Sequence, residues 1–350
     1  METRTSSSLA VGVDVGGTRI KAGLVDEHGG VVRSTRRDTP DRTTDPGVVE
    51  DAVVAAVDEL LHAPELAGGA VVGVGIGAAG FVAADRGTVV FAPHLSWRDE
   101  PLQATVATRL GMPVVVDNDA NAAAWAEHRF GAGRGESHLL VVTLGTGIGG
   151  STIIDGRVQR GRHGLAGEFG HMMVVPEGRR CECGNRGCWE QYASGSVMRR
   201  EALEMLRSGS PHAAGLLEWC DGDPERLDGE DVTRAARAGE GAAVELLAEV
   251  GRWLGVGLAN LVAALDPGTI VVGGGASEAG DLLLAPARQS LARHLTGRGH
   301  RPLPPVRAAA LGVSAGLVGA ADLARRAGQA ERARHTGGAG PAPRSGTTGA

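Results

Sequence analysis

The sequence has 350 residues, of which 42% are hydrophobic, and its 35 basic and 41 acidic residues give a net charge of -6. This length suffices for about two domains with hydrophobic cores, and no cluster of Lys and Arg favours a nucleic-acid partner. The first residues lack the pattern of a signal peptide, and Gly, Pro or charges interrupt every apolar run before membrane-spanning length. We therefore expect a globular, cytoplasmic protein that binds neither nucleic acid nor membrane.

Two stretches of the chain, 9–37 and 138–160, share one pattern of three apolar, β-branched strands separated by Gly- and Asp-rich turns. At one constant offset, Asp14 aligns with Thr143 and Gly16 with Gly145. Each stretch therefore predicts a β-meander, and their similarity predicts a molecule built from two related halves.

Helix and strand patterns follow each meander. In the first half we expect a helix at 46–62, strands at 70–77 and 113–117, and a helix at 119–130. In the second half we expect a helix at 241–265, a strand at 269–272, a helix from about 278 and a last helix at 314–328. The pattern predicts a duplicated α/β fold, and the Gly-, Pro- and Ser-rich composition from about residue 333 onward predicts a disordered tail.

Three Gly-rich stretches, 75–80, 145–150 and 273–275, could pass for dinucleotide-binding loops. The first two run into strand-like sequence instead of a helix, which argues against a Rossmann site, and no P-loop motif occurs. The hairpin turns at 16–18 and 145–147 instead offer backbone N–H groups that could hold phosphates from two sides. The alternative is that these glycines only shape the turns. A carboxylate beside such a clamp, Asp14, would suit Mg²⁺.

The stretch GEFGHMMVVPEGRRCECGNRGCWE, residues 167–190, brings together Cys181, Cys183 and Cys188. With His171 they make a ligand set that suits tetrahedral zinc, and four protein ligands leave no open position, so the metal would be structural. A disulfide or redox pair is the alternative, but no CxxC is present. The fourth cysteine, Cys220, lies outside the motif.

A cluster of polar residues, Asp117, Asn118, Asp119 and Asn121, stands where a predicted strand passes into a predicted helix. One such residue is a common helix N-cap. Four exceed what a cap requires, and strand ends in α/β folds commonly open on a cleft. The cluster therefore predicts a functional site.

These motifs resemble, in order, those of the ROK family of bacterial sugar kinases over roughly residues 9–328. The matching segments are DVGGT at 14–18, NDAN at 118–121, LGTGIGG at 144–150, GEFGH at 167–171 and CxCGxxGCxE at 181–190. Among the members, glucose-phosphorylating enzymes of high-GC Gram-positive bacteria are the most similar. The resemblance implies the actin-like ATPase (ribonuclease H-like) fold, with a sugar and ATP cleft between two α/β domains. We expect the first domain at 1–118, completed by the helix at 314–328, and a larger one at 119–313 that carries the zinc segment.

The resemblance also implies roles for individual residues. Asp119 would accept the proton of the attacking sugar hydroxyl, and His171 would use one ring nitrogen for zinc and the other for the sugar. The other sugar contacts would be Asn118, Glu168 and Glu190. The phosphate groups would lie against Asp14, Gly16, Gly17, Thr18, Gly145, Thr146 and Gly147, and the adenosine against Gly273, Gly274 and Gly275. ATP, Mg²⁺ and structural Zn²⁺ would be the cofactors, and a homo-oligomer, either a dimer or a tetramer, is expected.

The leading expectation is ATP-dependent phosphorylation of the 6-hydroxyl of glucose. The alternatives are a ROK kinase for fructose, mannose or an N-acetylhexosamine, a kinase that uses polyphosphate, and a sugar-responsive transcription regulator. Family regulators carry a DNA-binding domain ahead of the first phosphate motif, and only 13 residues precede Asp14 here. We therefore expect an enzyme.

Overall fold

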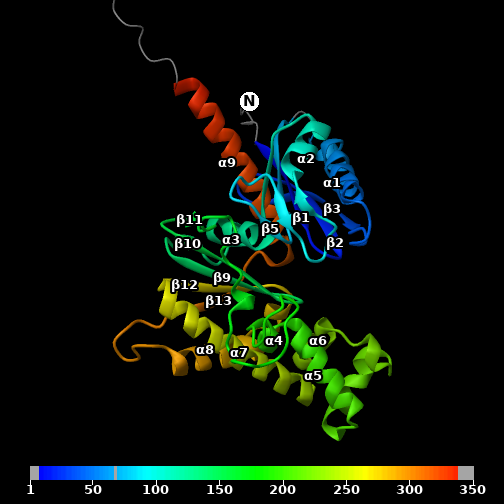
Figure 1. The fold of residues 1–350 in the computed structure, drawn as a ribbon, viewed down its shortest axis with the longest axis vertical. Coiled ribbons are helices and arrows are strands. Elements are labelled where there is room, and N and C mark those ends of the chain that lie inside the picture. The colour runs from blue at the N-terminus through cyan, green and yellow to red at the C-terminus, as the bar shows by residue number, and fades with distance from the viewer. Residues whose placement is uncertain (1–7, 67–68, 338–350) are drawn as a thin grey trace, which may run out of the picture.

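The computed structural model describes residues 8–66 and 69–337, and that part of the chain contains two five-stranded sheets that repeat one topology (Figure 1). In the first sheet, in the order β3-β2-β1-β4-β8, the first three strands are antiparallel neighbours, and β4 and β8 run parallel to β1. The strands are β1 (Leu9–Val15), β2 (Arg19–Val25), β3 (Val31–Asp38), β4 (Val71–Ala78) and β8 (Val114–Asn118).

The second sheet has the order β11-β10-β9-β12-β13, again with an antiparallel meander followed by two parallel strands. Its strands are β9 (Leu139–Leu144), β10 (Ile148–Ile154), β11 (Arg157–Val158), β12 (Thr269–Gly273) and β13 (Val306–Ala308). The strands β1, β4, β9 and β12 are largely buried and rich in Val, Ile and Leu, as strands covered on both faces are. The duplication expected from the two meanders is confirmed.

Helices cover both sheets (Figure 1). Helix α1 begins at Pro46 because the Asp45 side chain accepts a hydrogen bond from Gly47 N, and α1 packs against β2 and β3. The helices are α1 (Pro46–Leu61), α2 (Leu102–Leu110), α3 (Asp119–Phe130), α4 (Glu190–Ala193), α5 (Gly195–Arg207), α6 (Gly229–Arg237), α7 (Gly241–Leu265), α8 (Asp281–His294) and α9 (Ala315–Gly337). Helix α7 is long and apolar enough to cross a membrane, but 61% of its most apolar window is buried, and it forms the core of the second half.

The last helix, α9, returns to the first sheet (Figure 1). Two strand glycines make this possible, because a Cβ at Gly12 would lie 1.8 Å from Leu317 O and one at Gly75 would lie 1.8 Å from Ala320 O. Helix α9 also packs against α3, which contacts β10 of the second sheet. The two helices therefore join the halves of the molecule.

The end of α9 differs from the end that the sequence predicts. The helix was expected to end near residue 328, but it continues to Gly337, so residues 333–337 of the expected disordered tail are helical. Residues 329–334 are Gln, Ala, Glu, Arg, Ala and Arg, which favour helix and outweigh the cost of about 1 kcal/mol that a glycine such as Gly328 imposes. The rest of that expected tail, 338–350, lies outside the described residues.

A small sheet that the sequence did not predict extends the first half. It consists of β5 (Phe81–Val82), β6 (Val89–Phe91) and β7 (Arg98–Glu100), in that order. Leu95 and Trp97, in the connection between β6 and β7, are fully buried in the core of the first half. The core thus fixes these short strands beside the end of β4.

Candidate active site and metal centre

A pocket of about 190 Å³, here called the Asp119 pocket, lies where β8 passes into α3. It combines residues from five parts of the chain: the end of β4 with its following strand, the loop after β6, the start of α3, the strand β10, and the segment 166–171. Its lining consists of Ala79, Gly80, Phe81, Pro93, His94, Asn118, Asp119, Ala120, Gly149, Gly150, Ala166, Gly167, Glu168 and His171. Four residues predicted to contact sugar, Asn118, Asp119, Glu168 and His171, therefore line one pocket.

The start of α3 fixes one oxygen of the Asp119 carboxylate. Asn118 is the N-cap, and its side-chain oxygen accepts a hydrogen bond from Asn121 N at 3.1 Å. Its Nδ2 donates to Gly80 O at 3.1 Å and to Asp119 Oδ1 at 3.0 Å. Ala120 N donates to the same Oδ1 at 2.9 Å. Neither of these last two hydrogen bonds engages Oδ2.

The surroundings of Asp119 raise its pKa. Burial is the main cause, and together with the neighbouring carboxylates Asp14 and Glu168 it raises the pKa of Asp119 to about 7. A carboxylic acid with a pKa near the working pH is suited to accept a proton and release it again.

The predicted zinc ligands lie together. The ligand atoms of His171, Cys181, Cys183 and Cys188 are all within 4.8 Å of one another. The sulfurs of Cys183 and Cys188 are 3.6 Å apart, as are Cys181 Sγ and His171 Nδ1. Zinc–sulfur bonds of about 2.3 Å place tetrahedral ligands about 3.8 Å apart, so these four residues fit a zinc ion.

The metal-ligand segment is anchored to the core of the second half through Trp189. This residue is fully buried, and its indole N–H donates to Trp253 O at 2.8 Å. Its ring lies against Gly257 of α7, where a Cβ would be 2.0 Å from Trp189 Cε2. The position of Cys188, the residue before Trp189, is thereby fixed by packing.

His171 connects the cysteine cluster to the Asp119 pocket. Its Nδ1 faces Cys181, and its Nε2 lies 4.0 Å from Glu168 Oε2. Burial raises the pKa of Glu168. Glu190 does not line the pocket among the described residues; its Oε1 lies 3.5 Å from His171 Nδ1 and accepts a hydrogen bond from Cys181 Sγ at 3.1 Å.

A second pocket, of about 370 Å³, lies beside the turn between β9 and β10 and is here called the Thr146 pocket. The N-terminus of α5 closes one side, because Gly195 N donates to Gly145 O at 2.8 Å and Ser196 Oγ donates to Thr146 O at 2.6 Å. The lining consists of Gly145, Thr146, Gly195, Ser196, Met198, Arg199, Asp228, Gly229, Glu230, Thr233, Gly275 and Ala276.

The structure brings only some of the predicted nucleotide residues to these pockets. Of the Gly273–Gly275 run, Gly275 alone lines the Thr146 pocket. Gly273 is buried in β12, and Gly274 has a φ of 84° and lies so close to β9 that a Cβ would be 2.3 Å from Leu144 O. Those two glycines shape the chain so that Gly275 reaches the pocket.

The first hairpin lies next to the Asp119 pocket rather than in its wall. Among the described residues that line the two pockets, none of Asp14, Gly16, Gly17, Thr18 and Gly147 occurs. A Cβ at Gly17 would nevertheless lie 2.6 Å from Cβ of His94, a pocket residue, and a Cβ at Gly147 would lie 2.7 Å from Glu190 Oε2. Both turns therefore border the site at positions where a side chain would collide.

Several lining residues were not predicted from the sequence. The largest group belongs to α5 and α6: Gly195, Ser196, Met198, Arg199, Asp228, Gly229, Glu230 and Thr233. Asp228 carries a local signal, since it forms a capping box with Asp231 at the start of α6. That signal predicts a helix start but not its position beside residue 146.

Known proteins share the sequence and the fold of this chain. The ROK family model matches residues 10–327. A glucokinase of Streptomyces coelicolor is 48% identical over 317 residues, which cover 91% of this chain and 98% of that relative. The crystal structure of a ROK family glucokinase from Streptomyces griseus in complex with glucose and AMPPNP matches with a TM-score of 0.83 and 48% identity, covering 91% of this chain and 100% of that one. A putative xylose repressor of Caldicellulosiruptor sp. is 33% identical over 290 residues, covering 83% of this chain and 71% of that relative.

The match covers nearly all of the described residues and includes each motif on which the resemblance rested. The actin-like ATPase fold expected from the sequence is confirmed by the similarity to the solved ROK structure and by the two repeated sheets. The chain belongs to the ROK family.

Proposed function

We propose that the chain is an ATP-dependent glucose kinase that transfers the terminal phosphoryl group to the 6-hydroxyl. One observation carries this proposal: a single hairpin serves both pockets. Gly145 and Thr146 line the Thr146 pocket, while Gly149 and Gly150, a few residues further along β10, line the Asp119 pocket. A nucleotide in the first pocket and a sugar in the second would thus meet along this hairpin. The similarity to glucokinases supports glucose as the sugar.

Asp119 is the proposed general base. Its Oδ1 is held by Asn118 Nδ2 and Ala120 N, which leaves Oδ2 to accept the proton of the attacking hydroxyl. Phosphoryl transfer demands little covalent work from the protein, because positioning and charge neutralisation dominate. One oriented carboxylate therefore suffices. Asn118, Glu168 and His171 would hold the other sugar hydroxyls from the surrounding walls.

Asp14 would hold Mg²⁺, directly or through water. Its carboxylate is buried, which raises its pKa, and Gly316 leaves room for it, since a Cβ there would be 2.8 Å from Asp14 Cγ. A bound divalent cation would stabilise that charge and neutralise the phosphates. The turns at 16–18 and 145–147 would supply the backbone donors for the phosphates, and Gly275 would lie against the adenosine.

A structural zinc ion would be held by His171, Cys181, Cys183 and Cys188. Bound there, the metal would fix the ring of His171 and therefore the direction of its Nε2 toward the sugar. Glu190, which lies next to both His171 and Cys181, would be a further sugar contact, as the resemblance implies. The division into domains at 118/119, the homo-oligomer and the cytoplasmic location stay predictions.

A coupled assay over a panel of hexoses tests the proposal. The purified protein is given glucose, fructose, mannose or N-acetylglucosamine, with ATP or polyphosphate as donor. We expect the highest kcat/KM with glucose and ATP. A higher value with another hexose or with polyphosphate would contradict the proposed substrates. No turnover with any combination of hexose and donor would contradict the proposed kinase activity.

A further inference from the structure

We infer that Asp117, Arg160, Arg86 and Asn121, here called the Asp117 cluster, are positioning residues. They hold three walls of the Asp119 pocket in fixed positions relative to one another. The first wall is 118–120, the second is 166–171 and the third is 79–81. The inference rests on the proposed function, since it concerns the pocket that would take glucose. None of the four touches the Asp119 pocket among the residues that line it. Their effect would pass through the main chain of the residues that do.

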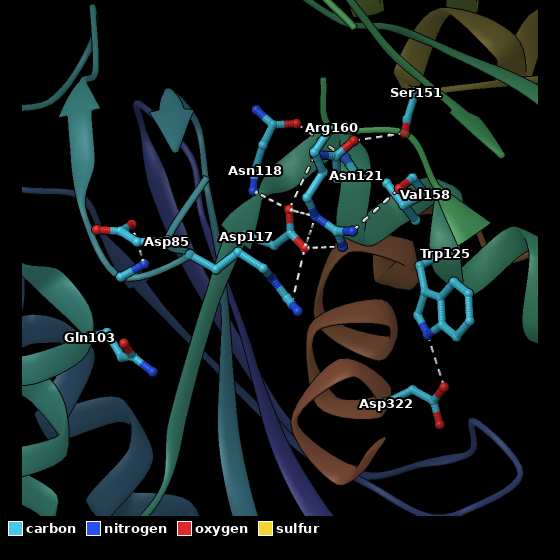
Figure 2. A network of polar contacts seen from close by, with 12 residues as sticks. Asp85, Gln103, Asp117, Asn118, Asn121, Trp125, Ser151, Val158, Arg160 and Asp322 are labelled. Carbon is cyan, nitrogen blue, oxygen red and sulfur yellow. Dashed lines mark hydrogen bonds and ion pairs between the residues drawn. The ribbon is translucent and has the colours of Figure 1, made fainter. Parts of the chain in front are cut away.

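The Asp117 carboxylate is the centre of the cluster (Figure 2). Its side chain is only 3% exposed, and Arg160 donates to it through Nε, at 3.2 and 3.0 Å to the two oxygens, and through Nη2, at 2.5 Å to Oδ2. Arg86 Nη2 forms an ion pair with Oδ2 at 3.2 Å. Asn121 Nδ2 donates to Oδ1 at 3.1 Å, and Asn118 N donates to Oδ1 at 3.0 Å. Such a forked, largely buried contact restricts geometry more than a single ion pair does.

The partners come from both halves of the molecule. Asp117 lies in β8 of the first sheet, one residue before its end, whereas Arg160 follows β11 of the second sheet. Asn121 on α3 adds a second link, because its Oδ1 accepts a hydrogen bond from the buried Ser151 Oγ of β10 at 2.7 Å (Figure 2). The cluster therefore spans the boundary between the two sheets at one point.

Each arm of the cluster leads to a different wall of the pocket. Asp117 directly precedes Asn118 and Asp119. Arg160 O accepts a hydrogen bond from Ala166 N at 3.0 Å, and the wall 166–171 begins at that residue. Arg86 lies in the loop after β5, the strand that contains the lining residue Phe81.

The backbone supports this arrangement at two points. Arg86 has a φ of 58°, a left-handed conformation that a non-glycine residue adopts at a cost. Gly164 of the 160–166 loop has a φ of 88° and lies against the end of β5, where a Cβ would be 2.3 Å from Val82 O. The second and third walls are thus packed on each other as well as tied to Asp117.

Loss of an ion pair that served stability alone would lower the stability of the fold but would not change the kinetic constants for one substrate and spare those for the other. The Asp117 cluster instead borders the segments around the sugar and is separate from the residues that line the Thr146 pocket. Its loss would displace Asp119 and residues 166–171 relative to each other. A displacement of about 1 Å in a reacting group can cost about a hundredfold in rate.

The test compares Arg160→Lys, Asp117→Asn and the double variant with the wild type. Lys keeps the charge of Arg160 but loses the fork. We expect Arg160→Lys to raise the KM for glucose and lower kcat, so that kcat/KM for glucose falls by about 10–100-fold, while the KM for ATP stays within about twofold. The kcat/KM for glucose of the double variant should be little lower than that of the more impaired single variant, because both substitutions break the same contact between Arg160 and Asp117.

Arg129→Gln is the matched control. Arg129 also pairs with a buried carboxylate, Asp322, at 3.3 Å, but this pair joins α3 to α9 away from both pockets. It should lower the melting temperature and leave both KM values unchanged. The inference is overturned if Arg160→Lys is folded and keeps its kcat/KM for glucose, or if the two KM values rise together. An inactive wild type would overturn the proposed function and the inference with it. If Asp117→Asn does not fold, Arg160→Lys alone decides.

Discussion

Cys181 and Glu168 lie on opposite sides of one imidazole ring. His171 Nδ1 is 3.6 Å from Cys181 Sγ, and His171 Nε2 is 4.0 Å from Glu168 Oε2. The proposed metal centre and the proposed sugar pocket therefore share a residue. A change in the metal centre should be felt by the sugar through the orientation of this ring.

Removal of the metal should weaken glucose binding and stability together. We expect Cys183→Ala to lose zinc, to melt at a lower temperature and to raise the KM for glucose by about tenfold, because the ring of His171 is no longer fixed. Elemental analysis, thermal unfolding and steady-state kinetics check this. Cys220→Ala, outside the ligand group, should keep its zinc and its KM. Normal glucose affinity in metal-free protein would show that the two sites are not coupled.

Asp119→Asn should lose catalysis and keep substrate binding. A general base is typically worth about 10²–10⁴-fold, so kcat should fall by that factor while calorimetry still detects glucose binding. Asp45→Asn is the matched control, because Asp45 is the N-cap of α1 and Asn caps equally well. Near-normal turnover of Asp119→Asn would remove Asp119 from the proposed role.

The raised pKa of Asp119 predicts a pH dependence of catalysis. Only the ionised carboxylate accepts a proton, and its pKa is about 7. Below that pH, kcat/KM for glucose should fall by about tenfold per pH unit, and above it the value should level off. Initial rates between pH 5 and pH 9 check this. A flat profile between pH 5 and pH 7 would contradict the assignment.

The same pKa predicts a cost in stability. The folded protein holds the Asp119 proton up to about pH 7, whereas the unfolded chain releases it near the ordinary value of 3.8. The free energy of unfolding should therefore decrease as the pH rises from about 4 to about 7. Asn at position 119 does not ionise, so the Asp119→Asn variant does not lose stability in this way. Its melting temperature should therefore rise relative to that of the wild type as the pH increases from 4 to 8. An equal difference at both pH values would contradict the burial of this charge.

The Thr146 pocket should respond to added volume at Gly275. A Cβ at this glycine meets no protein atom within 4 Å, so a side chain at this position should leave the fold intact. Gly275→Leu would fill part of the pocket and should raise the KM for ATP by at least about tenfold, with the KM for glucose unchanged. Kinetics with each substrate varied in turn check this. An unchanged KM for ATP in the Leu variant would place the nucleotide elsewhere.

Local patterns were sufficient to predict much of the fold. The repeated meanders, α1, α3, α7 and the cysteine cluster all follow from residues close together in the sequence, and the structure has each of them. The small sheet β5-β6-β7 was missed because its strands have two or three residues each, too few for a periodic pattern. Core packing around the buried Trp97, rather than local propensity, fixes it.

The rest of the site depends on contacts between distant segments. Gly195 and Asp228 reach the Thr146 pocket only because the start of α5 is hydrogen-bonded to the turn of the second hairpin and α6 packs against α5. Asp117 belongs to a cluster of four polar residues that exceeds what a helix cap requires, but its partner Arg160 lies 43 positions away. Sequence spacing carries no signal for such a pair. The three-dimensional fold is required to find it.

The most direct measurement identifies the product. The wild-type protein is incubated with ATP, Mg²⁺ and ¹³C-labelled glucose, and the product is examined by ³¹P and ¹³C NMR. We expect one phosphate per sugar, coupled to C6, formed by the wild type and not detectably by Asp119→Asn over the same time. Phosphate on another hydroxyl, or equal product from both proteins, would contradict transfer to the 6-hydroxyl with Asp119 as the base.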